Sequence, residues 1–152
     1  QRDAIAPAEA RCIAQLDLEN AYGRFLRSTA LAAASARAPR IARLAAVQWR
    51  EGHVHVWQRQ DDGAWARDPS ARGGFQGSRL AQVMFALDLE AVFQDEASST
   101  GEGGLVRVGV ADDTYLTGTV GALVEYWPQL EVALTSHGHR LQPVKSNVLI
   151  PA

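Results

Sequence analysis

Two adjacent aspartates between two apolar runs constrain the fold of this chain more than any other feature. Residues 108–110 and 114–117 have the alternating pattern of β-strands, and Asp112 and Asp113 lie between them. A period of two predicts strands, and aspartate is common in tight turns. We therefore predict a β-hairpin that carries two carboxylates at its turn. Taken alone, such a pair is most often only a turn.

A second apolar run also ends in a carboxylate. Residues 11–18 read as a buried strand, and Asp17 lies near its end. If this strand neighbours the hairpin, the carboxylates gather in one place, where they repel each other unless a cation lies between them. Mg²⁺ suits such a site because it prefers oxygen ligands, and Mn²⁺ is the alternative ion.

Composition limits the remaining choices. With 152 residues, 47% of them hydrophobic, the chain is one domain at most and can bury a sizeable core. The single cysteine, Cys12, lies in an apolar run and is predicted to be a buried free thiol. No run approaches the length of a membrane span and no secretory signal is recognisable. We expect an intracellular protein without membrane contact; nucleus and cytoplasm are not distinguished. The formal charge of −2 does not indicate a nucleic-acid surface.

The other periodicities predict an α+β fold, an antiparallel sheet with helices packed on one face. The expected elements are a strand over 11–18, an alanine-rich helix over about 20–36 ended by Pro39, a helix or strand over 40–50, a hairpin turning at Asp62-Gly63, a helix from Ser78 to about 96, the Asp-Asp hairpin, a helix over 119–137, and short strands around 139–142 and 146–150.

Four segments, in order, resemble the palm motifs of reverse transcriptases. They are Leu-Asp-Leu-Glu-Asn-Ala-Tyr at 16–22, Gly-Phe-Gln-Gly-Ser-Arg-Leu at 74–80, Val-Ala-Asp-Asp at 110–113, and Gly-His-Arg-Leu through Lys-Ser at 138–146. One motif alone is weak, whereas the ordered set over about residues 12–150 is specific. The four motifs resemble those of retrons, group II intron proteins and non-LTR retroelements more than those of retroviral enzymes. The resemblance implies that residues 1–152 are a partial polymerase palm whose fingers and thumb are missing.

The resemblance also implies a function. A reverse transcriptase palm is an RNA-directed DNA polymerase, which adds deoxynucleotides to a primer 3′-hydroxyl by two-metal nucleotidyl transfer. Its partners are an RNA template, a DNA primer, deoxynucleoside triphosphates and the remaining fingers and thumb. Because primer-template affinity depends largely on phosphate contacts from basic side chains, we expect the segment to be inactive by itself.

Residue roles follow from the same resemblance. The metal ligands would be Asp17, the carbonyl of Leu18, Asp112 and Asp113. Lys145 would act near the triphosphate, by charge neutralisation or by proton donation to pyrophosphate. The aromatic ring of Tyr22 would exclude a ribose 2′-hydroxyl, and Gln76 and Gly77 would border the nucleotide and template. Each of the last four residues also has a plain reading: core packing for Tyr22, a loop-to-helix junction for Gln76-Gly77, and a solvated lysine for Lys145.

The chain departs from the family at three places, none of which removes a metal ligand. Residues 78–82, Ser-Arg-Leu-Ala-Gln, replace the usual Asp or Cys followed by Pro-Leu-Ser-Pro. Val110 replaces an aromatic residue, and Gln142-Pro143 stand where an asparagine is usual. The departures indicate a divergent or decaying element. The alternative function is therefore a decayed reverse-transcriptase-like domain that only binds RNA, as maturase-type proteins do.

Three further hypotheses have less support. His53, His55, His137 and His139 are potential zinc ligands, but no cysteine cluster accompanies them. Ser78 lacks the Gly-x-Ser-x-Gly elbow of a hydrolase. A nucleotide cyclase would share the palm and its metals but would act without a template.

Overall fold

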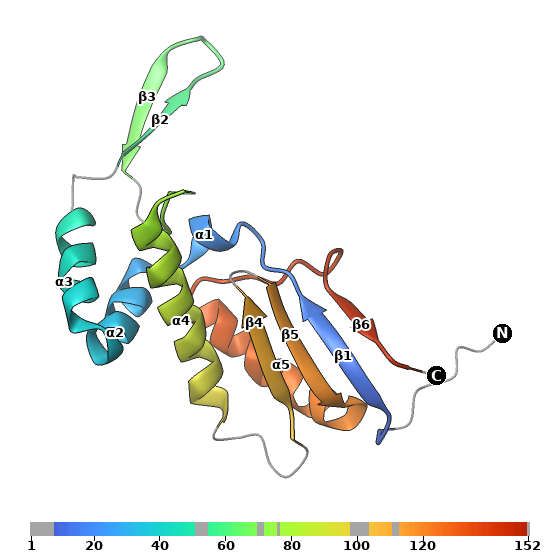
Figure 1. The fold of residues 1–152 in the computed structure, drawn as a ribbon. Coiled ribbons are helices and arrows are strands. Elements are labelled where there is room, and N and C mark those ends of the chain that lie inside the picture. Colours follow the sequence, from blue (N-terminus) through green and yellow to red (C-terminus); the bar gives the residue numbers. More distant parts are fainter. Residues whose placement is uncertain are drawn as a thin grey trace. The chain divides into compact units, whose positions relative to one another are not determined.

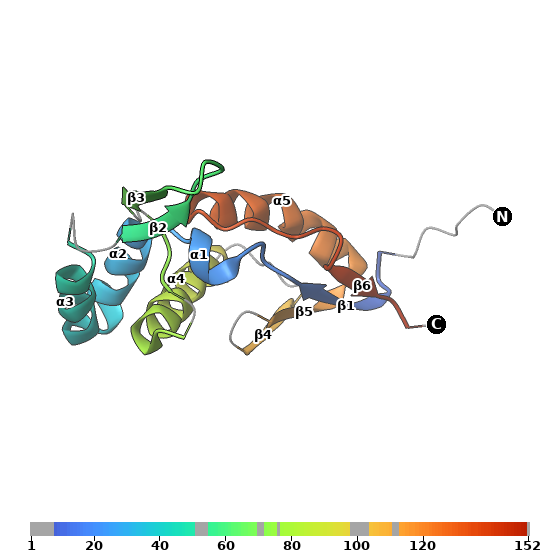
Figure 2. The same cartoon turned by 90° about the horizontal axis from the view of Figure 1, so that it is seen from above.

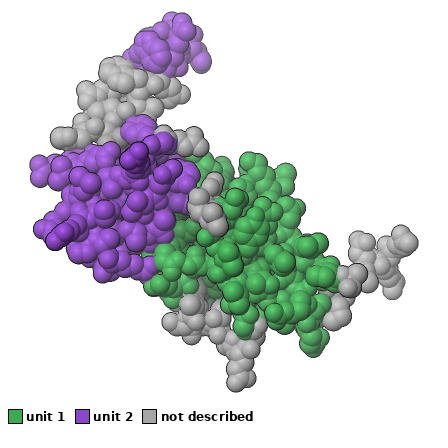
Figure 3. Space-filling view, in the orientation of Figure 1, with its two compact units in different colours: residues 1–21, 89–152 green, residues 22–88 purple. Residues whose placement is uncertain are grey.

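The computed structural model describes residues 8–50, 55–69, 72–75, 77–97, 104–110 and 113–151. The chain divides into two compact units, which Figure 3 colours separately: residues 1–21 with 89–152, and residues 22–88. We call them the sheet unit and the helical unit. Across these described ranges, no helix has the length and apolarity needed to cross a membrane.

The sheet unit is built on four antiparallel strands in the order β4-β5-β1-β6 (Figure 1). Their bounds are Val106–Val110 for β4, Asp113–Thr119 for β5, Arg11–Leu16 for β1 and Asn147–Leu149 for β6. The central pair is in register over the full length of β1, from Arg11 opposite Thr119 to Leu16 opposite Thr114. The predicted strand at 11–18 and the predicted Asp-Asp hairpin are therefore neighbours in one sheet.

Helices cover one face of this sheet. Every second residue of β1 and β5 is buried, including the predicted free thiol Cys12. Helix α5, Val120–Ser136, lies along the sheet on this side, and Leu123, Leu130 and Leu134 at helical spacing contribute to the core (Figures 1 and 2). A buried side chain of this size contributes roughly 1.5–3 kcal/mol to folding. The structure confirms the α+β fold with an antiparallel sheet and helices on one face.

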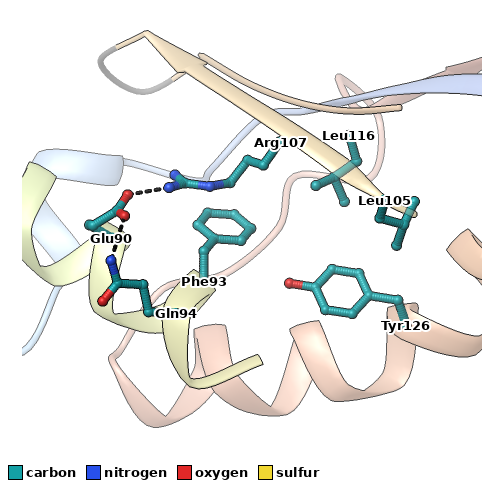
Figure 4. A pocket seen from close by; sticks show the side chains of 7 residues that line it. All are labelled: Glu90, Phe93, Gln94, Leu105, Arg107, Leu116 and Tyr126. Atoms are coloured by element: carbon teal, nitrogen blue, oxygen red, sulfur yellow. Dashed lines mark hydrogen bonds and ion pairs between the residues drawn. The ribbon is translucent and has the colours of Figure 1, made fainter. Parts of the chain in front are cut away.

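A cavity of about 230 Å³ lies on the helix-covered side of the sheet (Figure 4). Arg107 enters it from β4, with its guanidinium carbon 4.5 Å from the centroid of the Phe93 ring, and forms an ion pair with Glu90 of helix α4, Arg79–Ala97. Its walls are completed by other α4, sheet and α5 residues, and the full lining is Glu90, Phe93, Gln94, Leu105, Arg107, Leu116 and Tyr126. Of the residues predicted to be catalytic, the three that the structure describes, Asp17, Asp113 and Lys145, do not line this cavity.

The helical unit differs from the prediction at one important place. The expected single helix over 20–36 is two helices, α1 at Ala21–Arg24 and α2 at Arg27–Arg37. They are separated because Leu26 is extended, with φ −77° and ψ 125°, and forms a β-bridge with Arg72. Pro39 does not only end a helix: it lies in the first turn of α3, Pro39–Gln48, where a missing N–H costs nothing.

Other expected elements of the helical unit are present. Strands β2, His55–Arg59, and β3, Trp65–Pro69, pair as the predicted hairpin across residues 60–64. Ser78 begins α4 as an N-cap, with its hydroxyl accepting a 3.4 Å hydrogen bond from the amide of Ala81. Alanines on α2 and α3 are buried together with Phe25, Met84 and Phe85, so small side chains let the helices of this unit approach closely.

The end of the chain corrects a second prediction. Residues 146–150 contain the short strand β6, but residues 139–142 are not a strand. Leu141 forms only an isolated antiparallel bridge with Leu18. The reason is local: Pro143 has no N–H to donate, and residues 143–145 turn, with Lys145 and Ser146 donating backbone hydrogen bonds to the carbonyl of Gln142.

Candidate functional site

Asp17 and Asp113 lie at the same end of neighbouring strands. The last pair between β1 and β5 is Leu16 with Thr114, so Asp17 and Asp113 each lie one residue beyond it. Leu16 and Thr114 face the helices, and the alternation of strand residues therefore puts both aspartates on the open face. The structure brings these two predicted ligands to the same end of the two central strands.

One oxygen of Asp17 is buried without a hydrogen bond. The side chain is 31% exposed, yet no described residue donates a hydrogen bond to its Oδ2, which is shielded from solvent. The ammonium of Lys145 lies 3.8 Å from this oxygen, which is an ion-pair distance but too long for a hydrogen bond. A buried carboxylate oxygen with only one distant cation is an acceptor with capacity for another positive partner.

Lys145 is thereby placed beside the predicted catalytic aspartate, although 128 residues separate the two in sequence. Its side chain is 69% exposed, so it agrees with the plain reading of a solvated lysine as well as with a role near Asp17. The prediction of its action on a triphosphate stays a prediction.

The turn over residues 142–146 holds the backbone of Asp17, a feature that the sequence reasoning missed. The amide of Asp17 donates a 3.1 Å hydrogen bond to the hydroxyl of Ser146, and that hydroxyl donates to the carbonyl of Gln142 at 3.0 Å. The amide of Gln142 in turn donates to the carbonyl of Asp17 at 2.9 Å. The available signal was the Lys-Ser pair of the fourth motif, in which we had assigned a role only to the lysine.

The carbonyl of Leu18, a predicted metal ligand, points away from the neighbouring segment at residues 140–142. Leu18 and Leu141 form a bridge flanked by hydrogen bonds from Glu19 to Arg140 and from Gln142 to Asp17. In such a pair the N–H and C=O of Leu18 point away from Leu141, toward the side on which β5 runs. Within the described ranges, no backbone amide donates to this carbonyl.

These groups fit a hard divalent cation. The carboxylates of Asp17 and Asp113 at one end of neighbouring strands, with the buried Oδ2 of Asp17, and the carbonyl of Leu18 are the oxygen donors that Mg²⁺ and Mn²⁺ prefer. Asp112, a predicted ligand, lies outside the described residues, and the described ones by themselves do not gather three or more metal-binding His, Cys, Asp or Glu side chains. Of the four potential zinc ligands, His53 lies outside the described residues and the side chain of His55 is not described either, so the zinc hypothesis stays a prediction.

The predicted nucleotide-binding residues belong to the helical unit. Tyr22 is half-buried, and its ring centroid lies 4.8 Å from that of Phe85, so core packing accounts for part of the ring. Gly77 is exposed just before the N-cap of α4, and Gln76 lies outside the described residues. The loop that leads to Gly77 is bound to the segment of Tyr22, because the amide of Gly74 in this loop donates a 2.7 Å hydrogen bond to the carbonyl of Tyr22.

Comparison with known proteins identifies the fold but no family. No protein-family model and no curated protein matches the chain. Among solved structures, apo telomerase from Candida tropicalis matches with a TM-score of 0.69 and 11% identity over 98% of this chain and 30% of that one. Telomerase from Candida albicans, in complex with a TWJ fragment of telomeric RNA, matches with a TM-score of 0.67 and 14% identity over 92% and 28%.

The corresponding RNA complex from Candida tropicalis matches with a TM-score of 0.70 and 10% identity, over 93% of this chain and 26% of that one. At such identities the likeness shows the fold alone. Telomerases are related to reverse transcriptases, so the chain has a reverse-transcriptase-like fold. It spans less than a third of these telomerase chains. The narrower assignment to retrons, group II introns or non-LTR elements stays a prediction.

Proposed function

We propose that this chain is the palm of an RNA-directed DNA polymerase that extends a DNA primer on an RNA template. The observation that carries the proposal is the placement of Asp17 and Asp113 at one end of neighbouring strands, with Lys145 3.8 Å from Asp17. The reverse-transcriptase-like fold supports it, and so does the RNA held by two of the similar telomerases. The order of the four motifs along the chain supports the same reaction.

In this proposal Asp17, Asp112, Asp113 and the carbonyl of Leu18 hold two divalent cations. Bound there, the ions supply Lewis acidity at the attacking 3′-hydroxyl and at the leaving pyrophosphate. Ser146 fixes the backbone of Asp17 through its hydroxyl, so the carboxylate is held before the ions arrive. Lys145 supplies positive charge on the same side of the sheet, Tyr22 excludes the 2′-hydroxyl, and Gln76 and Gly77 border the nucleotide.

A template-directed primer-extension assay on the full natural chain tests the proposal. We expect extension with Mg²⁺ or Mn²⁺, no extension with a chelator, and incorporation that follows the template base, because the motifs match template-dependent enzymes. Four templates that differ only in the first unpaired base provide the matched control. Product without a template would favour a cyclase-like palm enzyme. Tight RNA binding without any extension would favour the second candidate, an RNA-binding module.

The charge distribution favours keeping that second candidate. The net charge of −2 is the sum of two units of opposite charge. Residues 22–88 carry ten arginines and five carboxylates, whereas residues 1–21 and 89–152 carry five basic and twelve acidic side chains. Residues 20–50 hold six arginines and no Asp or Glu. The net charge of the whole chain does not indicate a nucleic-acid surface, whereas the helical unit by itself has the basic excess typical of such surfaces.

Arg40 and Arg43 give this idea a local test. Both are exposed on the outer face of α3, opposite its buried Ala42 and Ala45. Exchanging both for glutamate is expected to weaken binding of single-stranded RNA by about 100-fold at low salt and to lower the salt slope by about 0.7 per lost phosphate contact. Fluorescence anisotropy at several salt concentrations measures both quantities.

The control for this pair is Arg11→Glu, which reverses the charge of one exposed arginine of the sheet unit and so makes half of the charge change of the pair. It should shift affinity far less, because it lies on the acidic unit. A loss of about tenfold from the control, half of the logarithmic loss of the α3 variant, would mean that RNA responds only to total charge, and no α3 surface would exist.

A further inference from the structure

Arg27 clamps the loop that precedes the predicted nucleotide-binding turn. Its Nε donates a 2.8 Å hydrogen bond to the carbonyl of Gly73, and one terminal nitrogen donates to the carbonyl of Arg72 at 3.1 Å. The guanidinium carbon lies 5.3 Å from the centroid of the Trp49 ring, and that ring lies 5.9 Å from the ring of Phe25. Burial lowers the pKa of the Arg27 guanidinium from its ordinary value, but an arginine stays protonated.

The same loop is bound to the segment that carries Tyr22. The amide of Gly73 donates to the carbonyl of Phe25 at 2.8 Å, and the amide of Gly74 donates to the carbonyl of Tyr22 at 2.7 Å. Residues 72–74 are thus held by two backbone bonds and by the two bonds from Arg27. The loop cannot slide along residues 22–27 without breaking several of these bonds together.

This arrangement links the two places at which a nucleotide would be selected. The ring of Tyr22 is fixed on one side by Phe85, and Gly77 follows the clamped loop by only three residues. The position of Gly77 relative to Tyr22 therefore depends on the loop that Arg27 holds. A change in the clamp should alter the space available to the sugar without touching the strand-end carboxylates.

We infer that Arg27 is a positioning residue for sugar selection: through the carbonyls of Arg72 and Gly73 it holds the segment that leads to Gly77 against the segment that carries Tyr22. This inference rests on the proposed polymerase function. The arginine is required for its shape, because its planar fork reaches two successive carbonyls while it stacks on Trp49. A lysine has the same charge but a single ammonium centre, which does not reproduce the fork.

The test is Arg27→Lys in the full natural chain, with single-nucleotide incorporation measured for matched deoxy- and ribonucleotides. We expect kcat for the deoxynucleotide to change by less than about threefold, its KM to rise about tenfold, and the preference for deoxynucleotides to fall about tenfold, since small misplacements of a substrate carry costs of this order. Tyr22→Ala, which removes the ring itself, should give the upper limit of lost preference.

The matched control is Arg59→Lys, because Arg59 is an exposed arginine of the same unit at the end of β2 and lies outside the four motifs. It should leave all three quantities unchanged. Trp49→Leu is the second variant: it keeps both hydrogen bonds and removes the stacking partner of Arg27, together with the ring contact between Trp49 and Phe25. It should therefore lose preference in the same direction but to a smaller extent. If Arg27→Lys does not fold, the preference measured for Trp49→Leu tests the inference instead.

Two results are distinguishable from each other. In the first, the unchanged protein extends primers, but Arg27→Lys and Trp49→Leu lower the incorporation of deoxy- and ribonucleotides by the same factor, so the preference is intact. Arg27 is then only structural and the inference is wrong. If the unchanged protein extends no primer on any template, the proposed function fails, and the inference fails with it.

Discussion

Replacement of Asp17 by asparagine in the full natural chain is expected to lower primer extension by at least about 1,000-fold while the fold persists. Asparagine has the shape of aspartate but no charge, and its amide nitrogen offers a donor where a metal ligand must accept. The buried Oδ2 of Asp17 and its ion pair with Lys145 place the lost charge at the centre of the proposed site. Single-turnover extension under saturating nucleotide measures the loss directly.

Stability should move differently from activity. Asp17 and Asp113 lie on the same face at one end of neighbouring strands, so neutralising one of them removes repulsion in the absence of metal. We expect thermal unfolding of the metal-free variant at the same temperature as the unchanged protein, or a higher one. A loss of activity that came with a loss of fold would not support a metal ligand.

Glu19→Gln is the matched control, since it makes the same chemical change two residues away. Glu19 forms an ion pair with Arg140 at 3.6 Å, and its side chain is 37% exposed, similar to that of Asp17. It should cost less than about threefold in extension, because exposed ion pairs are worth little. If both variants lost activity by the same factor, Asp17 would have no special role.

The strands could be predicted because their information is local. Residues 11–16 and 113–119 alternate buried and exposed side chains, and the helix-covered face of the sheet follows from that alternation alone. The break at Leu26 could not be predicted in this way, because its extended backbone is set by a bridge to Arg72, 46 residues further along. Local propensity in an alanine-rich segment favours one continuous helix, and a distant backbone partner overrides it.

The candidate site shows the same division. Asp17 could be proposed as a ligand from its place after a strand, but nothing local connects it with Lys145; only the resemblance of ordered motifs brought the two together. Ser146 was missed because a serine hydroxyl has no role until a turn brings it to a particular amide. Arg27 could not be singled out from its local sequence, because its partners Arg72 and Gly73 come from a distant loop.

Gly73→Ala is expected to destabilise the helical unit by about 4 kcal/mol, through backbone strain and overpacking together. Gly73 has φ +57°, and a Cβ atom there would lie 2.4 Å from the carbonyl carbon of Gly23 and 2.4 Å from the carbonyl oxygen of Tyr22. These are backbone atoms, so no side-chain rotation relieves the contact. The loop must leave residues 22–23 and give up its hydrogen bonds with Tyr22 and Phe25.

Gly77→Ala separates backbone strain from overpacking, because it introduces the strain of a positive φ without a close contact of the added Cβ atom. Gly77 also has positive φ, at +87°, but a Cβ atom there would meet nothing within 4 Å. Its replacement should therefore cost only the strain, roughly 1 kcal/mol. Because the chain has two compact units, hydrogen exchange at the amides of 73 and 74 is a better measure than a single global transition. Gly73→Ala should accelerate exchange there strongly and Gly77→Ala only slightly; equal effects would show that backbone strain, and not the close approach to Tyr22, is why residue 73 is glycine.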